Sequence, residues 1–222
     1  MRSFCALCGA ALLALTCAGA ALAGPADLPD RYAPGLDGAP VLIEQPGTGA
    51  ALAVWSYRGR GEHDLAMAWR DASGVWGDVV FLGQNDGRDQ VTPAVAVDPA
   101  GTVYVAYAVR ETAQIHLAVV PAGSSDWTAP IPLTSLEQRR FAPALSVVAN
   151  RLVAAWRTFG GAVEIRHFPL FDPPTPLGIN GNNGAGEANK QGAPAIAAGQ
   201  GRLFVAWEDA GSGRIASRTL TP

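Results

Sequence analysis

Cysteine is nearly absent from this chain of 222 residues. Its three cysteines, Cys5, Cys8 and Cys17, all lie close to the N-terminus. The rest of the chain therefore cannot carry a disulfide scaffold, a thiolate zinc site or a cysteine nucleophile. Packing and hydrogen bonds have to stabilise the folded part without these chemical aids.

The chain is also poor in charge and in clusters of metal-binding side chains. Charged residues make up 16% of the sequence, the formal net charge is −3, and no basic run is longer than Arg139 and Arg140. Nucleic acid is therefore not an expected partner, because binding to a phosphate backbone requires a basic surface. The three histidines, His63, His116 and His167, are far apart in the sequence, so neither a metal nor another cofactor is predicted.

The chain has one long apolar run, and it lies at the N-terminus. Arg2 precedes the apolar residues 6–20, and Ala-Leu-Ala at residues 21–23 forms a small-x-small cleavage site. We therefore expect a signal peptide over residues 1–23, cleavage before Gly24, and a secreted or periplasmic protein. An uncleaved anchor and a lipoprotein modified at Cys17 are the alternatives. No later run approaches the roughly 20 apolar residues of a membrane span, so none is expected in the mature chain.

Helical periodicity is missing too, and a repeat of about 50 residues takes its place. Apolar runs open at four prolines: Pro40, Pro93, Pro143 and Pro194. The second run of each unit ends in a large aromatic residue: Trp55, Tyr107, Trp156 and Trp207. A third landmark recurs in step at Leu65, Ile115, Ile165 and Ile215. Because three landmarks keep one period, we predict four copies of one structural unit.

Each unit is predicted to consist of short antiparallel strands, because its runs are rich in Val, Ile and aromatic residues and are separated by Gly, Asp, Asn and Pro. The second runs are almost continuously apolar, which indicates strands covered on both faces. A fourth run follows at residues 79–82, 131–133 and, more weakly, 175–179. These features predict an all-β fold, a small β-propeller of about four four-stranded antiparallel blades. A β-sandwich is the competing fold.

One propeller domain is expected over residues 24–222, with units at residues 38–90, 91–140, 141–191 and 192–222. The last unit lacks a fourth run. Residues 27–37 resemble the fourth run of the second unit in their order of aromatic residue, proline and leucine, so we expect them to supply this strand and close the ring. A disordered lead is the alternative. The Gly/Asn-rich residues 178–192 are either a binding loop or a plain connection.

Candidate binding residues follow the second run of each unit, where the loops of a propeller open on one side. They are Arg58, Arg110, Arg157, Glu208 and Asp209, with Arg140 just ahead of an inner strand. Guanidinium groups bind carboxylates in bidentate geometry, so converging arginines predict a site for an acidic ligand. The alternative is a set of solvated loop charges that pair with one another and with Glu111 and Asp86. No catalytic residue is assigned.

Three tryptophans near the outer strands form a second candidate set: Trp69, Trp76 and Trp127. Aromatic rings in such positions can stack on the faces of sugars. Packing between blades is the alternative role, because large aromatic side chains also dominate protein cores.

The repeats resemble the sialidase-like propeller superfamily, which carries bacterial neuraminidase repeats. The resemblance rests on residues 93–107, Pro-Ala-Val-Ala-Val-Asp-Pro-Ala-Gly-Thr-Val-Tyr-Val-Ala-Tyr, and on Trp-Thr-Ala-Pro-Ile-Pro-Leu at residues 127–133. Asp-Ala-Ser-Gly-Val-Trp at residues 71–76 looks like a degraded form of the family's Asp-box turn. The resemblance implies a propeller over essentially the whole mature chain. The catalytic set of the family, an arginine triad, a tyrosine–glutamate pair and an aspartate, is not matched.

Together these patterns predict a secreted or periplasmic, non-catalytic β-propeller. It is expected to bind a glycan or another extracellular ligand on its loop face. A minimal exo-sialidase or related glycosidase is the first alternative, and a scaffold for an extracellular protein is the second.

Overall fold

The structure is a computed structural model that describes residues 40–58, 62–83, 86–136, 140–170, 192–209 and 212–220. Every regular element in these ranges is a β-strand. No described segment forms a helix long and apolar enough to cross a membrane. The expected signal peptide, the expected closing strand at residues 27–37 and the weak fourth run at residues 175–179 lie outside the described residues.

The strands form four antiparallel sheets, each made of strands that are consecutive in the chain. We call these sheets blades 1 to 4. Blade 1 contains β1 (Val41–Glu44), β2 (Ala51–Tyr57), β3 (Asp64–Arg70) and β4 (Val80–Leu82), and blade 2 contains β5 (Gln90–Val97), β6 (Val103–Val109), β7 (Gln114–Val120) and β8 (Ile131–Pro132). Blade 3 contains β9 (Arg140–Val148), β10 (Arg151–Thr158) and β11 (Val163–Pro169), and blade 4 contains β12 (Ala195–Gly199), β13 (Arg202–Asp209) and β14 (Arg214–Leu220).

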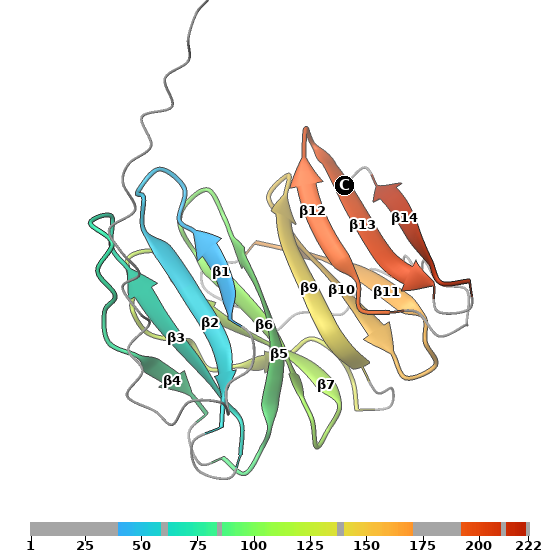
Figure 1. Ribbon diagram of the computed structural model, residues 1–222, viewed down its shortest axis with the longest axis horizontal. Coiled ribbons are helices and arrows are strands. Elements are labelled where there is room, and N and C mark those ends of the chain that lie inside the picture. Colours follow the sequence, from blue (N-terminus) through green and yellow to red (C-terminus); the bar gives the residue numbers. More distant parts are fainter. Residues whose placement is uncertain are drawn as a thin grey trace, which may run out of the picture.

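The blades stand side by side in chain order, from blade 1 on the left of Figure 1 to blade 4 on the right. The inner strand β5 contacts β2 of blade 1 and β9 of blade 3, and β9 in turn contacts β12 of blade 4. The all-β propeller fold with four antiparallel blades is therefore confirmed. The fourth strands β4 and β8 also fall where the apolar runs predict them.

The core lies between the blades, because each sheet presents apolar side chains on both faces. One buried cluster joins blades 1 and 2 and contains Val54, Val105 and Tyr107. A second joins blades 2 and 3 and includes Tyr104 and Trp156. The third joins blades 3 and 4: Val148, Val153, Ala155, Val163, Ile165, Leu203 and Val205.

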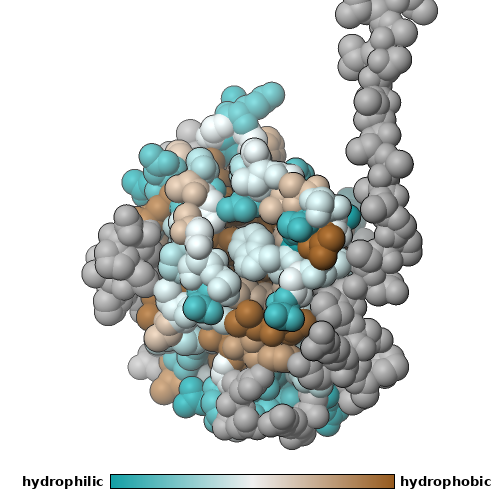
Figure 2. All heavy atoms as spheres, turned by 90° about the vertical axis from the view of Figure 1, so that its left-hand side faces the viewer, coloured by the Kyte–Doolittle hydropathy of each residue, from teal (hydrophilic) through white to brown (hydrophobic). Residues whose placement is uncertain are grey.

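The aromatic residue at the end of each second strand always points to the same face of its blade. Tyr107 of blade 2 packs toward blade 1, Trp156 of blade 3 packs toward blade 2, and Trp207 of blade 4 packs toward blade 3. Trp55 of blade 1 belongs to a cluster formed by blade 1 alone. Figure 2, which views the molecule from the blade 1 side, shows hydrophobic residues gathered below the middle of this face, among paler and hydrophilic ones. Among the described residues, Tyr107, Trp156 and Trp207 thus pack between blades, whereas Trp55 packs within its own blade.

One expectation about burial is wrong for blade 4. The middle strands β2, β6 and β10 are buried along most of their length, as a strand covered on both faces must be. In β13 the burial alternates instead, with Leu203 and Val205 buried and Phe204 47% exposed. No described residue of another blade covers the second face of β13, so the apolar side chains of this strand are well buried on one face only.

Candidate functional site

The loops that follow the second strands lie at one edge of the blades, which we call the loop edge. β2, β10 and β13 all run toward the same lower side of Figure 1. The first strand of a blade starts at this edge as well, since Gln90 pairs with Val109 and Arg140 pairs with Thr158. The predicted arginines and carboxylates therefore come from one edge of the molecule.

Arg110 is held in a cluster that joins three loops between blades 1 and 2. Its Nη1 donates to Asp89 Oδ2, and Asp89 Oδ1 accepts a bond of 2.8 Å from the His63 amide. The His63 ring atom Nδ1 lies 3.2 Å from the same carboxylate oxygen. The Asp89 amide donates to Glu111 Oε2 at 2.9 Å. The cluster thus ties the loop after β2 to the loops on either side of β5 and β6.

The electrostatics of this cluster keep Asp89 ionised. Burial by itself would raise the pKa of Asp89, but bonds from the His63 amide and ring and the charge of Arg110 outweigh this effect and lower the pKa below its usual value. Arg110 itself is 59% exposed. Its guanidinium can therefore meet a ligand on one side while it neutralises Asp89 on the other.

Arg140 occupies, at the junction of blades 2 and 3, the place that Gln90 occupies at the junction of blades 1 and 2. The Gln90 and Arg140 amides, each at the start of an inner strand, donate to His63 O at 2.7 Å and to Ala113 O at 2.8 Å. In both cases the bond fastens one blade to the loop of the blade before it. The repeat therefore extends to the hydrogen bonds between blades.

The Arg140 side chain is only 3% exposed and serves this junction. Its Nε donates to Glu164 Oε2 at 3.0 Å, and the same oxygen accepts a bond of 2.8 Å from Trp156 Nε1. Arg166 Nη2 lies 4.0 Å from that oxygen. Burial lowers the pKa of Arg166, and the charge of the nearby Arg140 adds to this effect, whereas the charge of Glu164 opposes it. Two guanidinium groups thus share one carboxylate at this junction.

The backbone near these junctions is irregular in the same way twice. Thr92 and Ala142 have positive φ angles of 51° and 49°, although neither is glycine. Register shifts follow in β5 between Val91 and Ala94 and in the β9–β10 pair. A bulge of this kind bends a strand and redirects its end. Here it accompanies the entry of each inner strand at the loop edge.

The other predicted residues lie at the ends of their own blades. Arg58 is exposed directly after β2 and forms no ion pair with another described residue. Arg157 is exposed, and its guanidinium carbon lies 5.9 Å from the centre of the Phe141 ring. Glu208 is exposed, and Asp209 Oδ2 accepts a bond of 2.9 Å from the Ser212 hydroxyl. The loop-edge set therefore shares one edge, but no single ion-pair cluster of described residues unites it.

Three charged or titratable partners in these clusters were not predicted as site residues: His63, Glu164 and Arg166. Their roles depend on contacts between blades, which a linear pattern does not display. The 50-residue repeat does offer a signal, because the polar residues Gln90 and Arg140 align at the start of successive inner strands. Polar positions that align between units, like the apolar ones, therefore indicate these junctions.

The three candidate tryptophans have different surroundings. Trp76 packs beside the buried cluster of blade 1 and forms an isolated bridge with Arg70. Trp69 and Trp127 pack against the core between blades 1 and 2. The indole nitrogens of both are buried and find no hydrogen-bond partner among the described residues. Trp69 also lines a pocket formed by described residues.

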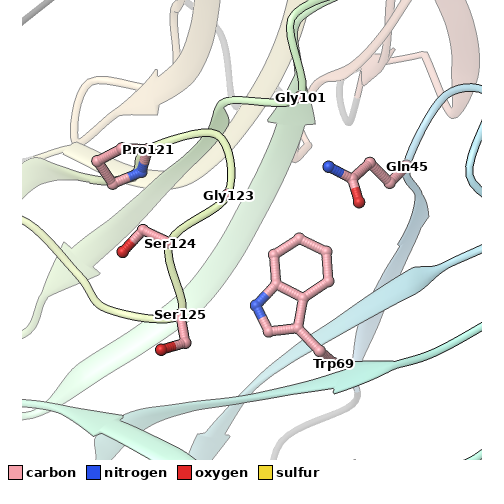
Figure 3. Close-up of a pocket in the computed structure, with 7 residues that line it drawn as sticks. All are labelled: Gln45, Trp69, Gly101, Pro121, Gly123, Ser124 and Ser125. Atoms are coloured by element: carbon pink, nitrogen blue, oxygen red, sulfur yellow. The ribbon is translucent and has the colours of Figure 1, made fainter.

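This pocket opens at the edge opposite the loop edge, between blades 1 and 2. Its volume is about 300 Å³. Blade 1 contributes Gln45 and Trp69, and blade 2 contributes Gly101 and the segment after β7. In Figure 3 the Trp69 ring stands between Gln45 and Ser125, with the indole nitrogen on the side of Ser125. The full lining is Gln45, Trp69, Gly101, Pro121, Gly123, Ser124 and Ser125.

The segment that resembles an Asp-box forms a tight turn built around Asp71. Asp71 Oδ1 accepts a bond of 2.6 Å from the Ser73 hydroxyl and one of 2.9 Å from the Val75 amide. Both bonds lower the pKa of Asp71, and the bond from Ser73 has the larger effect. Gly74 takes a positive φ of 93°, which an L side chain rarely adopts. The turn thus gives the aspartate a structural role.

A metal centre finds no support in the part of the chain that the structure describes. There, no group of three or more His, Cys, Asp or Glu side chains comes close enough together to hold an ion. The histidines lie in separate environments, and burial lowers the pKa of both His116 and His167.

No family model matches the sequence, and no curated protein is similar to it. Solved structures are similar in fold. A protein of unknown function from Dyadobacter fermentans has 16% identity and a TM-score of 0.62, over 79% of this chain and 51% of its own. An exo-β-1,3-galactanase from Clostridium thermocellum has 15% identity and a TM-score of 0.57, over 83% and 46%.

The sialidase of Trypanosoma rangeli is similar at 15% identity and a TM-score of 0.56, over 82% of this chain and 36% of the sialidase. The chain thus spans about half or less of each of these three proteins. Identities this low show a common fold alone, the β-propeller.

Proposed function

We propose that this protein is a non-catalytic β-propeller module that binds glycans outside the cytoplasm, in the periplasm or after secretion. The observation that carries the proposal is the set of exposed guanidinium groups of Arg58, Arg110 and Arg157 at the loop edge. Asp89, which His63 and Arg110 hold in place, has a lowered pKa. It therefore suits the ionised partner of an arginine and not the protonated acid that a glycosidase also needs.

Binding is better served by the groups that stay accessible at this edge. Arg58, Arg110 and Arg157 are exposed at this edge on blades 1, 2 and 3. Glu208 is exposed near the end of the corresponding strand of blade 4. Arginines bind carboxylates and hydroxyl-rich ligands through several parallel N–H donors. The loop edge is the proposed contact surface for an acidic glycan. The similarity in fold to a sialidase and a galactanase supports the choice of glycans over other extracellular ligands.

Glycan binding can be tested directly with an array. The array carries sialylated and β-1,3-galactose-containing oligosaccharides. These sugars correspond to the names of the two similar enzymes, the sialidase and the exo-β-1,3-galactanase. We expect selective binding that falls in Arg110→Ala, because that change removes an exposed guanidinium. Arg151→Ala is the matched control, since Arg151 is exposed at the other end of β10. Equal loss in both variants, or no binding by the wild type, would contradict the proposal.

A minimal glycosidase is the second candidate, and the similarity to the Trypanosoma sialidase favours it. The test is the release of dye from a fluorogenic sialoside and of galactose from β-1,3-galactan. Turnover that disappears in Asp89→Asn would replace the binding module by an enzyme. Absence of turnover together with binding on the array supports the module.

A protein scaffold is a third candidate because blade 4 exposes hydrophobic side chains. Phe204 is 47% exposed and Ile215 is 74% exposed, and Glu208 pairs with Ile215 across the strands. Exposed hydrophobic patches often mark sites of protein contact. Recovery of one defined protein partner, lost in Phe204→Asp, combined with an empty glycan array, would favour this role.

A further inference from the structure

We infer that the pocket between blades 1 and 2, at the edge opposite the loop edge, binds the ring of a neutral sugar. This inference rests on the proposed function and gives it a second, separate binding site. The pocket measures about 300 Å³ and lies at the small end of ligand pockets. That size suits one sugar ring, with the rest of a glycan chain lying outside.

The first argument is the indole N–H of Trp69. The Trp69 nitrogen is buried, and no described residue accepts a hydrogen bond from it. A buried donor without an acceptor is unfavourable, so a ligand oxygen placed there gains more than an ordinary surface bond. Figure 3 places this nitrogen on the side of the ring that faces Ser125. Because the nitrogen is buried in the unliganded protein, a ligand oxygen that enters between the two residues reaches it when the ring or the turn at Ser125 shifts.

The second argument is the amide of Gln45. Its Oε1 lies 3.4 Å from the Thr48 hydroxyl, but no described residue pairs with its Nε2. A Cβ atom on Gly101 would come within 2.8 Å of that Nε2, so the glycine lets the amide pack closely against its backbone. Gly101 also takes a positive φ of 92°, which other residues rarely adopt. The glycine therefore fixes where the Gln45 amide lies in the pocket wall.

The third argument is the character of the segment after β7. The Ser124 hydroxyl accepts a bond of 3.0 Å from the Asp126 amide, which fixes the turn. The Ser125 side chain is exposed and forms no bond with another described residue. Its hydroxyl can donate or accept as a ligand requires.

The chemistry of the lining selects a class of ligand. All seven lining residues are uncharged, and they combine an indole, an amide and two hydroxyls. An aromatic ring with a few placed hydrogen-bonding groups suits the apolar face and the hydroxyls of a pyranose. A sialic acid, whose carboxylate needs a cation, fits the loop edge and not this pocket. The pocket and the loop edge therefore select different sugars.

The experiment uses the full chain and two probes: methyl β-D-galactopyranoside and a β-1,3-linked galactan oligosaccharide. Binding is followed by calorimetry and by the NMR signal of the Trp69 indole N–H, which is assigned by its absence in Trp69→Phe. We expect the galactan to shift this signal. Trp69→Phe keeps an aromatic ring but removes the N–H, and it should weaken binding about tenfold. Ser125→Ala should weaken it about threefold, and Trp207→Phe, which changes a tryptophan between blades 3 and 4, should leave it unchanged.

The outcomes separate this site from the proposed function. Galactan binding that survives Trp69→Phe and Ser125→Ala but is lost in Arg110→Ala would overturn the pocket and keep a glycan-binding protein. A shift of the Trp69 signal caused by sialyllactose instead of galactan would overturn the neutral class of ligand. If no sugar of either class binds the wild type, the proposed function fails and the pocket inference fails with it. Thermal melts of each variant show whether it is folded.

Discussion

Blades 2 and 4 carry nearly the same middle strand in different surroundings. In β6 the run Val-Tyr-Val-Ala-Tyr is buried at every residue, whereas in β13 the run Leu-Phe-Val-Ala-Trp is buried on one face only. Blade 2 has blade 1 on one face and blade 3 on the other. Blade 4 has blade 3 on one face. The apolar sequence of a strand therefore shows which of its residues can be buried, and the neighbouring blades decide how many of them are.

The largest difference is expected for a charge placed in the middle of each strand. Ala106 is fully buried in β6, and Ala206 occupies the equivalent place in β13 on the less covered face. Ala106→Asp should lower the free energy of unfolding by about 4 kcal/mol or more, because it buries an unpaired charge. Ala206→Asp should change it by less than about 1 kcal/mol. Urea denaturation of both variants measures the two values.

Equal losses would break the comparison. They would mean that the second face of blade 4 is covered in solution, by another part of the chain or by a second copy. Sedimentation of Ala206→Asp separates these cases, since only a second copy changes the mass.

The next difference concerns the aromatic residues two positions earlier. Tyr104 is fully buried and donates its hydroxyl to Asp98 Oδ2 at 3.1 Å, whereas the equivalent Phe204 is half exposed. Tyr104→Ala should cost about 3–5 kcal/mol because it leaves a cavity. Phe204→Ala should cost about 1 kcal/mol. Tyr104→Phe is the control that removes only the hydroxyl, and it should cost less than Tyr104→Ala. Thermal and denaturant unfolding check the order.

A smaller difference is expected from pH. His116 pairs with Tyr107 across β6 and β7, and the equivalent residue of blade 4 is Ala216. Burial lowers the pKa of His116 below its usual 6.5, so the unfolded chain takes up a proton before the folded chain does. Stability should therefore be complete above pH 6.5 and fall as the pH drops toward the folded pKa. His116→Phe should flatten this dependence, and faster amide exchange in blade 2 than in blade 4 at pH 5 would locate it.

The smallest effect is expected at the loop edge. Arg110 is 59% exposed, so its ion pair with Asp89 should contribute less than about 1 kcal/mol to stability. Arg110→Ala should shift the melting temperature slightly, and more at low salt than at high salt. Arg202→Ala in blade 4, which changes an exposed arginine outside any described ion pair, should shift it less. A shift several times larger would mean that the Asp89 cluster holds blades 1 and 2 together.

The pattern of the sequence predicted the framework well and the site poorly. Apolar runs with a period of 50 residues placed β2, β6, β10 and β13 and the aromatics between blades. Arg110 was correctly placed after a second strand, but its partners Asp89 and His63 come from two other loops. Trp69 was singled out by its outer position, while the pocket beside it also needs Gln45 from a turn. Side chains that meet across blades leave no local periodicity, so the repeat indicates the junctions but not which side chains are in contact there.

The sequence by itself determined that this chain forms repeated antiparallel blades without thiols, because strand formation follows from local alternation, turns and apolar content. Only the tertiary structure decided which faces are covered, which charges pair and where a pocket opens. Burial and ion pairing depend on the residues of the next blade, about 50 positions away in the chain. The equivalent positions Tyr104 and Phe204 show this most directly, since one lies in the core and the other meets solvent.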